Sequence, residues 1–257
     1  MTIDGAFRAR VLAREFLAGF WLNLGSPVTA EMAGLAGFDW VMLDHEHGPG
    51  GESTMLHQLQ AVGATPATCL VRVAANEPPR FKRALDAGAH GVMVPYVSTP
   101  AEARAAVQAM RYPPRGMRGV AKLTRASAFG ARFDEYFAHA HEWLVTLVQI
   151  ETEEAVRNVA DIAAVDGVDV VFVGPMDLTT SMGIPGQYDN PRFHEALGVV
   201  ADAAERAGKA AGILLLDPAN VVLVRTLGYS VVALGSDGGA VQSGMRQSLE
   251  TLRRMGA

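Results

Sequence analysis

The sequence predicts a closed (β/α)8 barrel, the TIM-barrel fold. Eight short apolar runs alternate with longer segments of helical character, the pattern of a parallel sheet whose strands are joined by helices. The 257 residues, 49% of them hydrophobic, suit one barrel of roughly 250 residues. No Gly-x-Gly-x-x-Gly turn follows the first run, as a doubly wound dinucleotide-binding sheet would require. We therefore expect residues 1–257 to form a single α/β barrel domain.

The expected strands are the eight apolar runs, which are rich in valine and leucine and bounded by turn residues. Near-continuous apolar character is typical of parallel strands that are covered on both faces. In chain order, the runs are residues 20–24, 40–43, 69–73, 91–94, 144–150, 168–173, 211–216 and 230–234.

Helices are expected between the strands, where helix-favouring residues place apolar side chains three or four positions apart. The segment before Phe20 should form an extra helix ahead of the first strand. The clearest patterns after it are residues 78–87, 99–110, 153–164, 191–207 and 218–226.

Two further segments stand outside the simple repeat. Residues 111–143 are too long for a plain connection, and their Pro113-Pro114-Arg115-Gly116 start indicates an ordered excursion over the barrel mouth, with a helix near residues 132–140. Residues 241–255 carry apolar side chains at helical spacing, which favours packing over membrane binding. Gly238-Gly239 could form a phosphate-binding nest, but a turn is the simpler interpretation.

Composition narrows the class of partner. The net charge of −5, with arginines spread along the chain, favours a small-molecule ligand over nucleic acid. No apolar run approaches the 18 or so residues that span a bilayer, and the charged N-terminus lacks a signal-like apolar core, so we expect a cytoplasmic protein with no membrane partner. Cys69 is the only cysteine, which excludes an intrachain disulfide and favours a buried, inert thiol.

The candidate site comes from the carboxyl ends of the expected strands, where barrels of this type place their chemistry. The fourth and seventh ends are apolar, with Pro95 and residues 214–216, and should form a wall that includes Leu214. The other polar ends are Asp44-His45-Glu46-His47, Arg72, Gln149 with Glu151, Gly174-Pro175-Met176-Asp177 and Gly235-Ser236-Asp237.

Glu151 and Asp177 follow two successive strands, so their carboxylates should lie close together. Two oxygen ligands leave coordination positions of a hard cation such as Mg²⁺ open to water and to a chelating substrate. The alternative is a pair of ordinary solvated loop acids.

Several segments together resemble the 4-hydroxy-2-oxoheptanedioate aldolase family, within the aldolase/citrate lyase superfamily. Each motif alone is weak, but the combination is specific and covers most of the chain. The segments are Asp44-x-Glu46-His47-Gly48-Pro49, Val71-Arg72-Val73, Lys82-Arg83-x-Leu85-Asp86-x-Gly88-Ala89, Gly91-Val92-Met93-Val94-Pro95, Arg115-Gly116-x-Arg118-Gly119, Gln149-Ile150-Glu151-Thr152, Gly174-Pro175-x-Asp177-Leu178 and Gly235-Ser236-Asp237.

The resemblance implies a class II aldolase that reversibly cleaves a 4-hydroxy-2-oxo acid to pyruvate and an aldehyde through a metal-stabilised enolate. By the same resemblance, Glu151 and Asp177 hold the divalent metal, Arg72 contacts the oxo acid, and Asp44 with His47 handles the proton. Gln149 lies beside the metal. The metal would be Mg²⁺, or else Mn²⁺ or Co²⁺, and relatives act in aromatic breakdown and on aldehydes from sugar acids.

Further site and assembly features follow from the chemistry and the resemblance. Gly174, Met176 and Asp177 should line the substrate, because backbone N–H groups at a helix start can bind its carboxylate. The resemblance places Asp86 in the active site of a neighbouring subunit. It also implies a homohexamer in which the terminal helix is exchanged between subunits.

Residue chemistry supports the proton-transfer roles. His47 is the best general base, because an unperturbed imidazole titrates near neutral pH, and Asp44 would fix its tautomer. A Schiff-base mechanism needs a lysine near the substrate carbonyl. Of the three lysines, Lys82, Lys122 and Lys209, only Lys122 could reach the site from the expected excursion.

Other functions stay open at this point. His45-x-His47 could bind zinc in an amidohydrolase-like hydrolase, although no further histidine follows a later strand. A non-catalytic oxo-acid-binding barrel would keep the same pocket. A coenzyme A thioester lyase belongs to the same superfamily, but the sequence shows no obvious feature of an adenine-nucleotide site.

Overall fold

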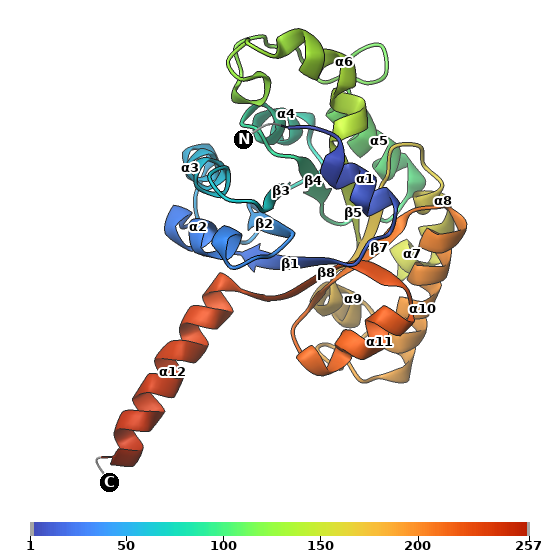
Figure 1. Ribbon diagram of the computed structural model, residues 1–257. Coiled ribbons are helices and arrows are strands. Elements are labelled where there is room, and N and C mark those ends of the chain that lie inside the picture. Colours follow the sequence, from blue (N-terminus) through green and yellow to red (C-terminus); the bar gives the residue numbers. More distant parts are fainter. Residues whose placement is uncertain (1–2, 256–257) are drawn as a thin grey trace.

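The fold is the expected closed barrel of eight parallel strands. A computed structural model describes residues 3–255 and orders the strands β1 to β8 around the barrel, with β8 pairing back to β1 (Figure 1). The strands are β1 (Leu17–Leu22), β2 (Trp40–Asp44), β3 (Thr68–Arg72), β4 (Gly91–Val94), β5 (Val145–Ile150), β6 (Val170–Val173), β7 (Ala210–Leu215) and β8 (Tyr229–Ser236).

Helices form the outer layer, and proline or a polar cap starts several of them. Thr99 and Glu102 form a capping box at α5, so two backbone donors that a helix start leaves unpaired are satisfied. The helices are α1 (Ala6–Leu12), α2 (Pro27–Leu35), α3 (Glu52–Val62), α4 (Pro78–Asp86), α5 (Pro100–Met110), α6 (Phe133–Trp143), α7 (Glu153–Arg157), α8 (Val159–Ala163), α9 (Pro175–Ser181), α10 (Pro191–Arg206), α11 (Val221–Thr226) and α12 (Asp237–Met255).

The interior of the barrel is filled by large side chains that face small ones. Trp40 and Phe172 meet edge to face, with ring centroids 6.3 Å apart. A Cβ at Gly19 would collide with Trp40, and one at Gly212 would collide with Phe172, so both glycines are needed for close packing. Phe7 of α1 joins this interior cluster, which shows that the extra helix closes the amino-terminal end of the barrel.

Several expected element boundaries differ from the structure, most clearly in the first strand and in residues 153–164. The first strand begins at Leu17 rather than Phe20, because Ala18 and Gly19 interrupt the apolar pattern yet pair with β8. The expected helix at residues 153–164 is two helices, α7 and α8, with a break at Asn158. The side-chain amide of Asn158 donates to the carbonyl oxygen of Ser98 at 2.9 Å.

The excursion does not lie over the barrel mouth. Residues 111–143 join the end of α5 to the start of β5, and both points lie at the amino-terminal end of the barrel. There α6 packs against α1. Arg125 donates to the carbonyl oxygens of Leu59 and Ala87, which lie at the carboxyl-terminal ends of α3 and α4. Strand direction explains this correction, because a helix that follows a strand returns the chain to the opposite end.

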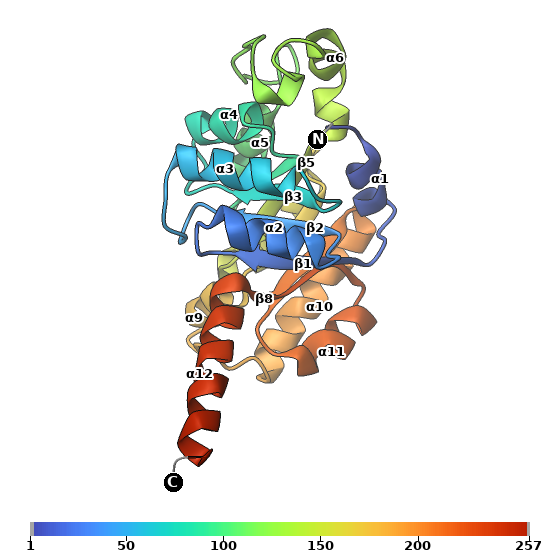
Figure 2. The same cartoon turned by 60° about the vertical axis from the view of Figure 1, so that its left-hand side comes forward.

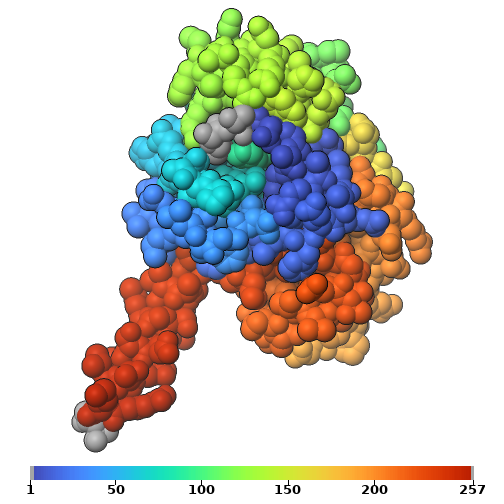
Figure 3. Space-filling model, in the orientation of Figure 1, coloured from blue at the N-terminus to red at the C-terminus, as the bar shows by residue number. Residues whose placement is uncertain are grey.

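The last helix, α12, projects away from the barrel (Figures 1 and 2), and the space-filling view shows it as a separate arm (Figure 3). Asp237 is its only buried residue, and its side chain accepts from the backbone N–H groups of Asn23 and Gly238. Gly238 therefore lies at the start of a helix, and its N–H is already hydrogen-bonded to Asp237 rather than free for a phosphate. None of the helices within residues 3–255 has both the length and the apolar character needed to cross a membrane.

Candidate metal and substrate site

The candidate site lies at the carboxyl ends of β2 to β6, where neighbouring strands bring the expected polar residues together. Register pairs Asp44 with Arg72 across β2 and β3, and Ile150 with Val173 across β5 and β6. Glu151 and Gly174 are the next residues after that second pair. A Cβ at position 174 would collide with Oε1 of Glu151, so only glycine leaves room for this carboxylate.

Glu151 is buried, with 2% of its surface exposed, and both carboxylate oxygens have donors. Oε1 accepts from Nε2 of Gln149 at 2.6 Å, and Oε2 accepts from the backbone N–H of Tyr96 at 3.0 Å. Burial, aided by the charges of Asp177 and Glu46, raises the pKa of Glu151 to about 7. A nearby positive charge would therefore favour the ionised form of this group at neutral pH.

Asp177 approaches the same region from the first turn of α9, which Pro175 starts. Its Oδ1 accepts from the phenol O–H of Tyr96 at 3.0 Å. Tyr96 thus contacts both of the acids that the sequence nominated as metal ligands. The burial of the Tyr96 phenol and its hydrogen bond to Asp177 raise the pKa of Tyr96 to about 12, so it stays a donor at neutral pH.

Arg72 is the central cation of the site. Its guanidinium donates to both oxygens of Asp44, at 2.6 and 3.1 Å, and forms an ion pair with Glu46 at 2.9 Å. It also lies over the ring of Trp21, 5.0 Å from the centroid. Burial opposes ionisation of Asp44, but the hydrogen bonds and charge of Arg72 outweigh it and hold the pKa of Asp44 below its usual value.

The expected contact between Asp44 and the His47 imidazole is not formed. Asp44 instead accepts from the backbone N–H groups of Glu46 and His47, both at 3.1 Å, which ties down the loop after β2. The His47 ring points outward with 65% of its side chain exposed, and its Nε2 lies 3.9 Å from the carboxylate of Glu46. Glu46 is therefore the acid beside His47, because the Asp44 carboxylate already accepts hydrogen bonds from Arg72.

His45 and His47 do not converge. His45 faces a small cavity of about 100 Å³ between α3 and α4, where burial holds its pKa below the usual value. Within residues 3–255, no group of three or more histidine, cysteine or acidic side chains is placed to hold a metal. The structure thus gives the zinc interpretation no support.

The donor set fits a hard divalent cation. Besides the two carboxylates, Oε1 of Gln149 is buried without a hydrogen-bond partner, directly beside Glu151. Burial and the charges of Asp44 and Asp177 also raise the pKa of Glu46. Asp44, Glu46 and Glu151 thus share the positive charge of Arg72 while Asp177 adds a further negative charge, and an oxygen-ligated cation would offset this excess.

Most of the chain is similar to proteins of one known family. Residues 17–243 match the HpcH/HpaI aldolase/citrate lyase family. The chain belongs to this family. It is 40% identical over 248 residues to the 5-keto-4-deoxy-D-glucarate aldolase of Shigella boydii, covering 96% of both chains. The family assignment is therefore broader than the resemblance to 4-hydroxy-2-oxoheptanedioate aldolases, and these relatives are a sibling group within it.

Solved structures of the HpcH/HpaI family give the same fold. A family protein from Burkholderia cenocepacia superposes with a TM-score of 0.92 at 39% identity, covering 97% of this chain and 100% of the other. An HpcH/HpaI aldolase from Desulfitobacterium hafniense superposes with a TM-score of 0.89 at 28% identity, covering 96% of both chains. The relatives named here as aldolases are carbon–carbon lyases by class.

The remaining site residues predicted for this HpcH/HpaI chain line the opening. Gly174 is buried at the start of α9, Met176 is 49% exposed, and Leu214 is the next-to-last residue of β7, within an apolar wall. Asp86 lies at the other end of the barrel, at the end of α4, where it pairs with Arg118 at 2.7 Å. It cannot reach the site of its own chain. Lys122 is also in the excursion, with its ammonium group over the ring of Phe133, so it does not supply a Schiff base here.

Sequence reasoning missed Tyr96 and the local role of Glu46. Tyr96 follows Pro95, just after the end of β4. This strand end was expected to contribute only apolar wall. The signal in the sequence was slight, since a single tyrosine after a strand is ordinary. Glu46 was visible within the motif, but its position beside Arg72 and His47 depends on the turn that Asp44 stabilises.

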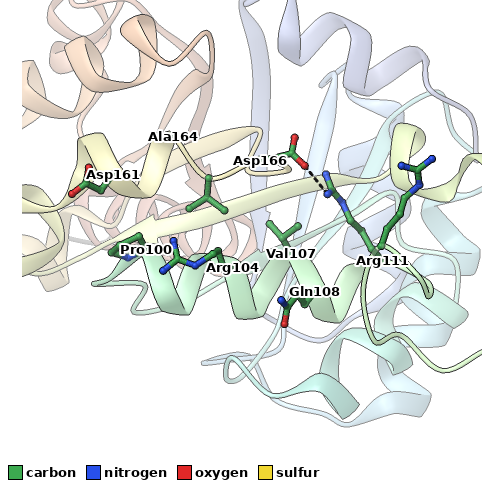
Figure 4. A pocket seen from close by; sticks show the side chains of 10 residues that line it. Pro100, Arg104, Val107, Gln108, Arg111, Asp161, Ala164 and Asp166 are labelled. Atoms are coloured by element: carbon green, nitrogen blue, oxygen red, sulfur yellow. Dashed lines mark hydrogen bonds and ion pairs between the residues drawn. The ribbon is translucent and has the colours of Figure 1, made fainter.

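A large groove also lies away from this site. A groove of about 550 Å³ runs between α5 and α8 on the outer helical layer (Figure 4). Arg111 crosses it to pair with Asp166 at 2.8 Å, and Arg104 and Arg115 also line it. This groove therefore does not coincide with the acids that gather at the carboxyl ends of the strands.

Proposed function

We propose that this protein is a divalent-metal-dependent aldolase that reversibly cleaves a 4-hydroxy-2-oxo acid to pyruvate and an aldehyde. The observation that carries the proposal is the donor set of Glu151, Asp177 and the unpartnered Gln149 oxygen, next to a buried arginine at the carboxyl end of the barrel. Membership of the HpcH/HpaI family supports the reaction class.

Glu151 and Asp177 would hold the cation, with Gln149 beside it. When bound, a divalent cation acts as a Lewis acid that polarises the 2-oxo group and offsets negative charge on the pyruvate half. Mg²⁺ is the preferred assignment, and Mn²⁺ or Co²⁺ would suit the same oxygen ligands.

Arg72 supplies a fixed positive charge within the acid cluster. Because Asp44 and the Trp21 ring lock its guanidinium in place, the charge needs no rearrangement when an oxo acid binds. Met176, Gly174 and Leu214 would shape the space for the rest of the substrate.

His47 would remove the proton from the 4-hydroxyl group in the cleavage direction. Its exposed ring at the rim can turn toward a bound substrate, and Glu46 at 3.9 Å can stabilise the cation formed on proton uptake. This assigns to Glu46 the orienting role that the sequence had suggested for Asp44.

The aldehyde half is the least defined part of the proposal. The Shigella boydii relative is named for 5-keto-4-deoxy-D-glucarate, which makes this compound the first substrate to test. 4-Hydroxy-2-oxoheptanedioate, a substrate type of aromatic catabolism, is the second. A non-catalytic oxo-acid-binding barrel is the remaining alternative.

We also propose that copies of this chain assemble through α12, with a homohexamer as the expected state. An apolar stripe on this helix is exposed, with Met245 69% and Leu252 68% accessible. On α2, Val28, Met32 and Leu35 are each about two-thirds exposed. A second copy would cover these faces, and Asp86 would then be able to reach a neighbour's site. A cytoplasmic location stays a prediction.

The test is an assay of purified protein with Mg²⁺, Mn²⁺ or Co²⁺ and a panel of 4-hydroxy-2-oxo acids, in which pyruvate release is measured. We expect a chelator to abolish release and added metal to restore it. Activity that resists the chelator, or a lysine adduct trapped by borohydride with pyruvate, would contradict the mechanism. Sedimentation of the wild type and of Leu249→Glu tests the assembly, since the substitution should yield smaller particles.

A further inference from the structure

We propose that Tyr96 is a positioning residue that holds Glu151 and Asp177 in the arrangement a metal ion requires. This inference rests on the proposed metal site. The two acids belong to different elements, since one follows β5 and the other lies in α9. Tyr96 follows β4 and hydrogen-bonds to both, with its backbone N–H on Glu151 and its phenol on Asp177, each at 3.0 Å.

The backbone of Tyr96 is in the left-handed region, with φ at 53°. Residues other than glycine adopt this region rarely, and where they do the surrounding structure must enforce it. Here the next residue is anchored, because the N–H of Val97 donates to the carbonyl oxygen of Gln149 at 3.2 Å. The turn places the N–H and the ring of Tyr96 on the same side, toward the acids.

The ring of Tyr96 is not there to fill the core. Of its surface 53% is exposed, and the contact that the structure gives its hydroxyl group is the one to Asp177. An exposed aromatic ring in an unfavourable backbone conformation gains little from burial. The two hydrogen bonds to the acids are the contacts that distinguish this position.

The hydrogen bonds suit a ligand-positioning role. Two neighbouring carboxylates repel each other before a cation arrives, and donors on each of them offset that repulsion. Each carboxylate oxygen has two acceptor positions, so one hydrogen bond leaves room for a cation on the same group. Removing such an outer contact from a metal ligand typically weakens metal affinity about 10- to 100-fold.

The experiment measures Mn²⁺ binding to the full-length protein without substrate, by calorimetry and by the loss of the free-Mn²⁺ electron paramagnetic resonance signal. Tyr96→Phe removes one hydroxyl group and keeps the ring. We expect its dissociation constant for Mn²⁺ to rise about tenfold. Tyr188→Phe is the matched control, because that phenol lies 3.8 Å from the sulfur of Met176 and should change affinity less than twofold.

A second variant separates positioning from folding. Tyr96→Gly removes the whole side chain but keeps the backbone N–H and suits a positive φ. It should weaken Mn²⁺ binding at least as much as Tyr96→Phe, while the metal-free protein unfolds at a temperature equal to or above that of the wild type. At saturating Mn²⁺, the kcat of Tyr96→Phe should return close to that of the wild type, as expected for a residue that acts through the metal ligands.

The outcomes distinguish the two proposals. If wild type and Tyr96→Phe bind Mn²⁺ equally well, the positioning role is overturned and the proposed function stands. If the wild type binds Mn²⁺ and Tyr96→Phe binds it about tenfold more weakly, but no oxo acid is cleaved, the positioning role stands and the aldolase proposal fails. If the wild type binds Mn²⁺ no better than Glu151→Gln, both are overturned.

Discussion

Two buried arginines, one at each end of the barrel, have nearly the same surroundings and different consequences. Arg72 and Arg118 each pair with an aspartate, at 2.6 and 2.7 Å, and each lies over an aromatic ring. Around Arg118 the charges balance, with Asp86 as the acid and Tyr112 and Tyr136 as neutral neighbours. Around Arg72 the acids outnumber the cation.

The difference shows which buried charges indicate function. A balanced ion pair such as Arg118 with Asp86 stabilises a local arrangement and leaves no excess charge for a cation to offset. An excess of acids, with the pKa of Glu151 raised to about 7, is an arrangement that an added positive charge would stabilise. Burial of an arginine alone would not have separated the two ends.

The largest effects are expected from substitutions of the acids at the Arg72 end of the barrel. Glu151→Ala or Asp177→Ala should abolish Mn²⁺ binding and lower turnover at least about 10³-fold, because a Lewis acid contributes several kcal/mol. Calorimetry and pyruvate release measure the two quantities. Arg118→Lys is the control and should bind Mn²⁺ like the wild type. Retained metal binding in both alanine variants would refute the ligand assignment.

The next effect concerns the other end. Arg118→Ala removes a buried guanidinium and leaves the partly buried Asp86 carboxylate without its partner, so it should lower the free energy of unfolding by about 3 kcal/mol. Urea denaturation measures the loss. Because the strands separate the two ends, the Mn²⁺ affinity of the folded fraction should not change. A variant of normal stability would show that Arg118 is not a structural anchor.

The pH dependence of the metal-free protein sharpens the comparison. Glu151 has a folded pKa of about 7, above the usual value of 4.5, so the folded state binds more protons than the unfolded state between these values. Stability in chelator should therefore fall by about 3 kcal/mol as the pH rises from about 4.5 to about 7. Thermal unfolding across this range should show a weaker decline for Glu151→Gln. An equal decline in both proteins would assign it to other groups.

The smallest expected effect separates the proton-transfer residues from the metal ligands. His47→Ala should leave Mn²⁺ affinity unchanged and lower turnover about 100-fold, the usual scale for a general base. Glu46→Gln should lower turnover about tenfold, since a residue that orients a catalytic group through a hydrogen bond or charge acts on that scale. Steady-state kinetics at saturating metal provide the test. Loss of metal binding in His47→Ala would revive a role for histidine as a ligand.

The sequence predicted most of the barrel and the grouping of polar residues at its carboxyl end, for physical reasons. Apolar runs fix buried parallel strands, and a barrel places every strand end at one mouth, so Glu151, Asp177 and Arg72 could be grouped without coordinates. The carboxyl partner of His47 could not be predicted from spacing, because Asp44 can turn toward either Arg72 or the imidazole. Only the distances in the structure show that Asp44 pairs with Arg72.

Tyr96 and the excursion were missed for different reasons. The role of Tyr96 depends on a left-handed backbone angle, and a tyrosine is not a residue type that signals one. The excursion was placed at the wrong end because its length suggested a lid, although its position between α5 and β5 fixes both of its ends. Chain direction was the stronger argument.

The single thiol of Cys69 gives this chain a practical property. Cys69 is fully buried in β3, and burial raises the pKa of its thiol, so it should not react with labelling reagents in the folded protein. A cysteine introduced on α12, such as Ser243→Cys, would then be the only reactive one. A spin label or fluorophore attached there would follow this helix as subunits mix, without interference from the native chain.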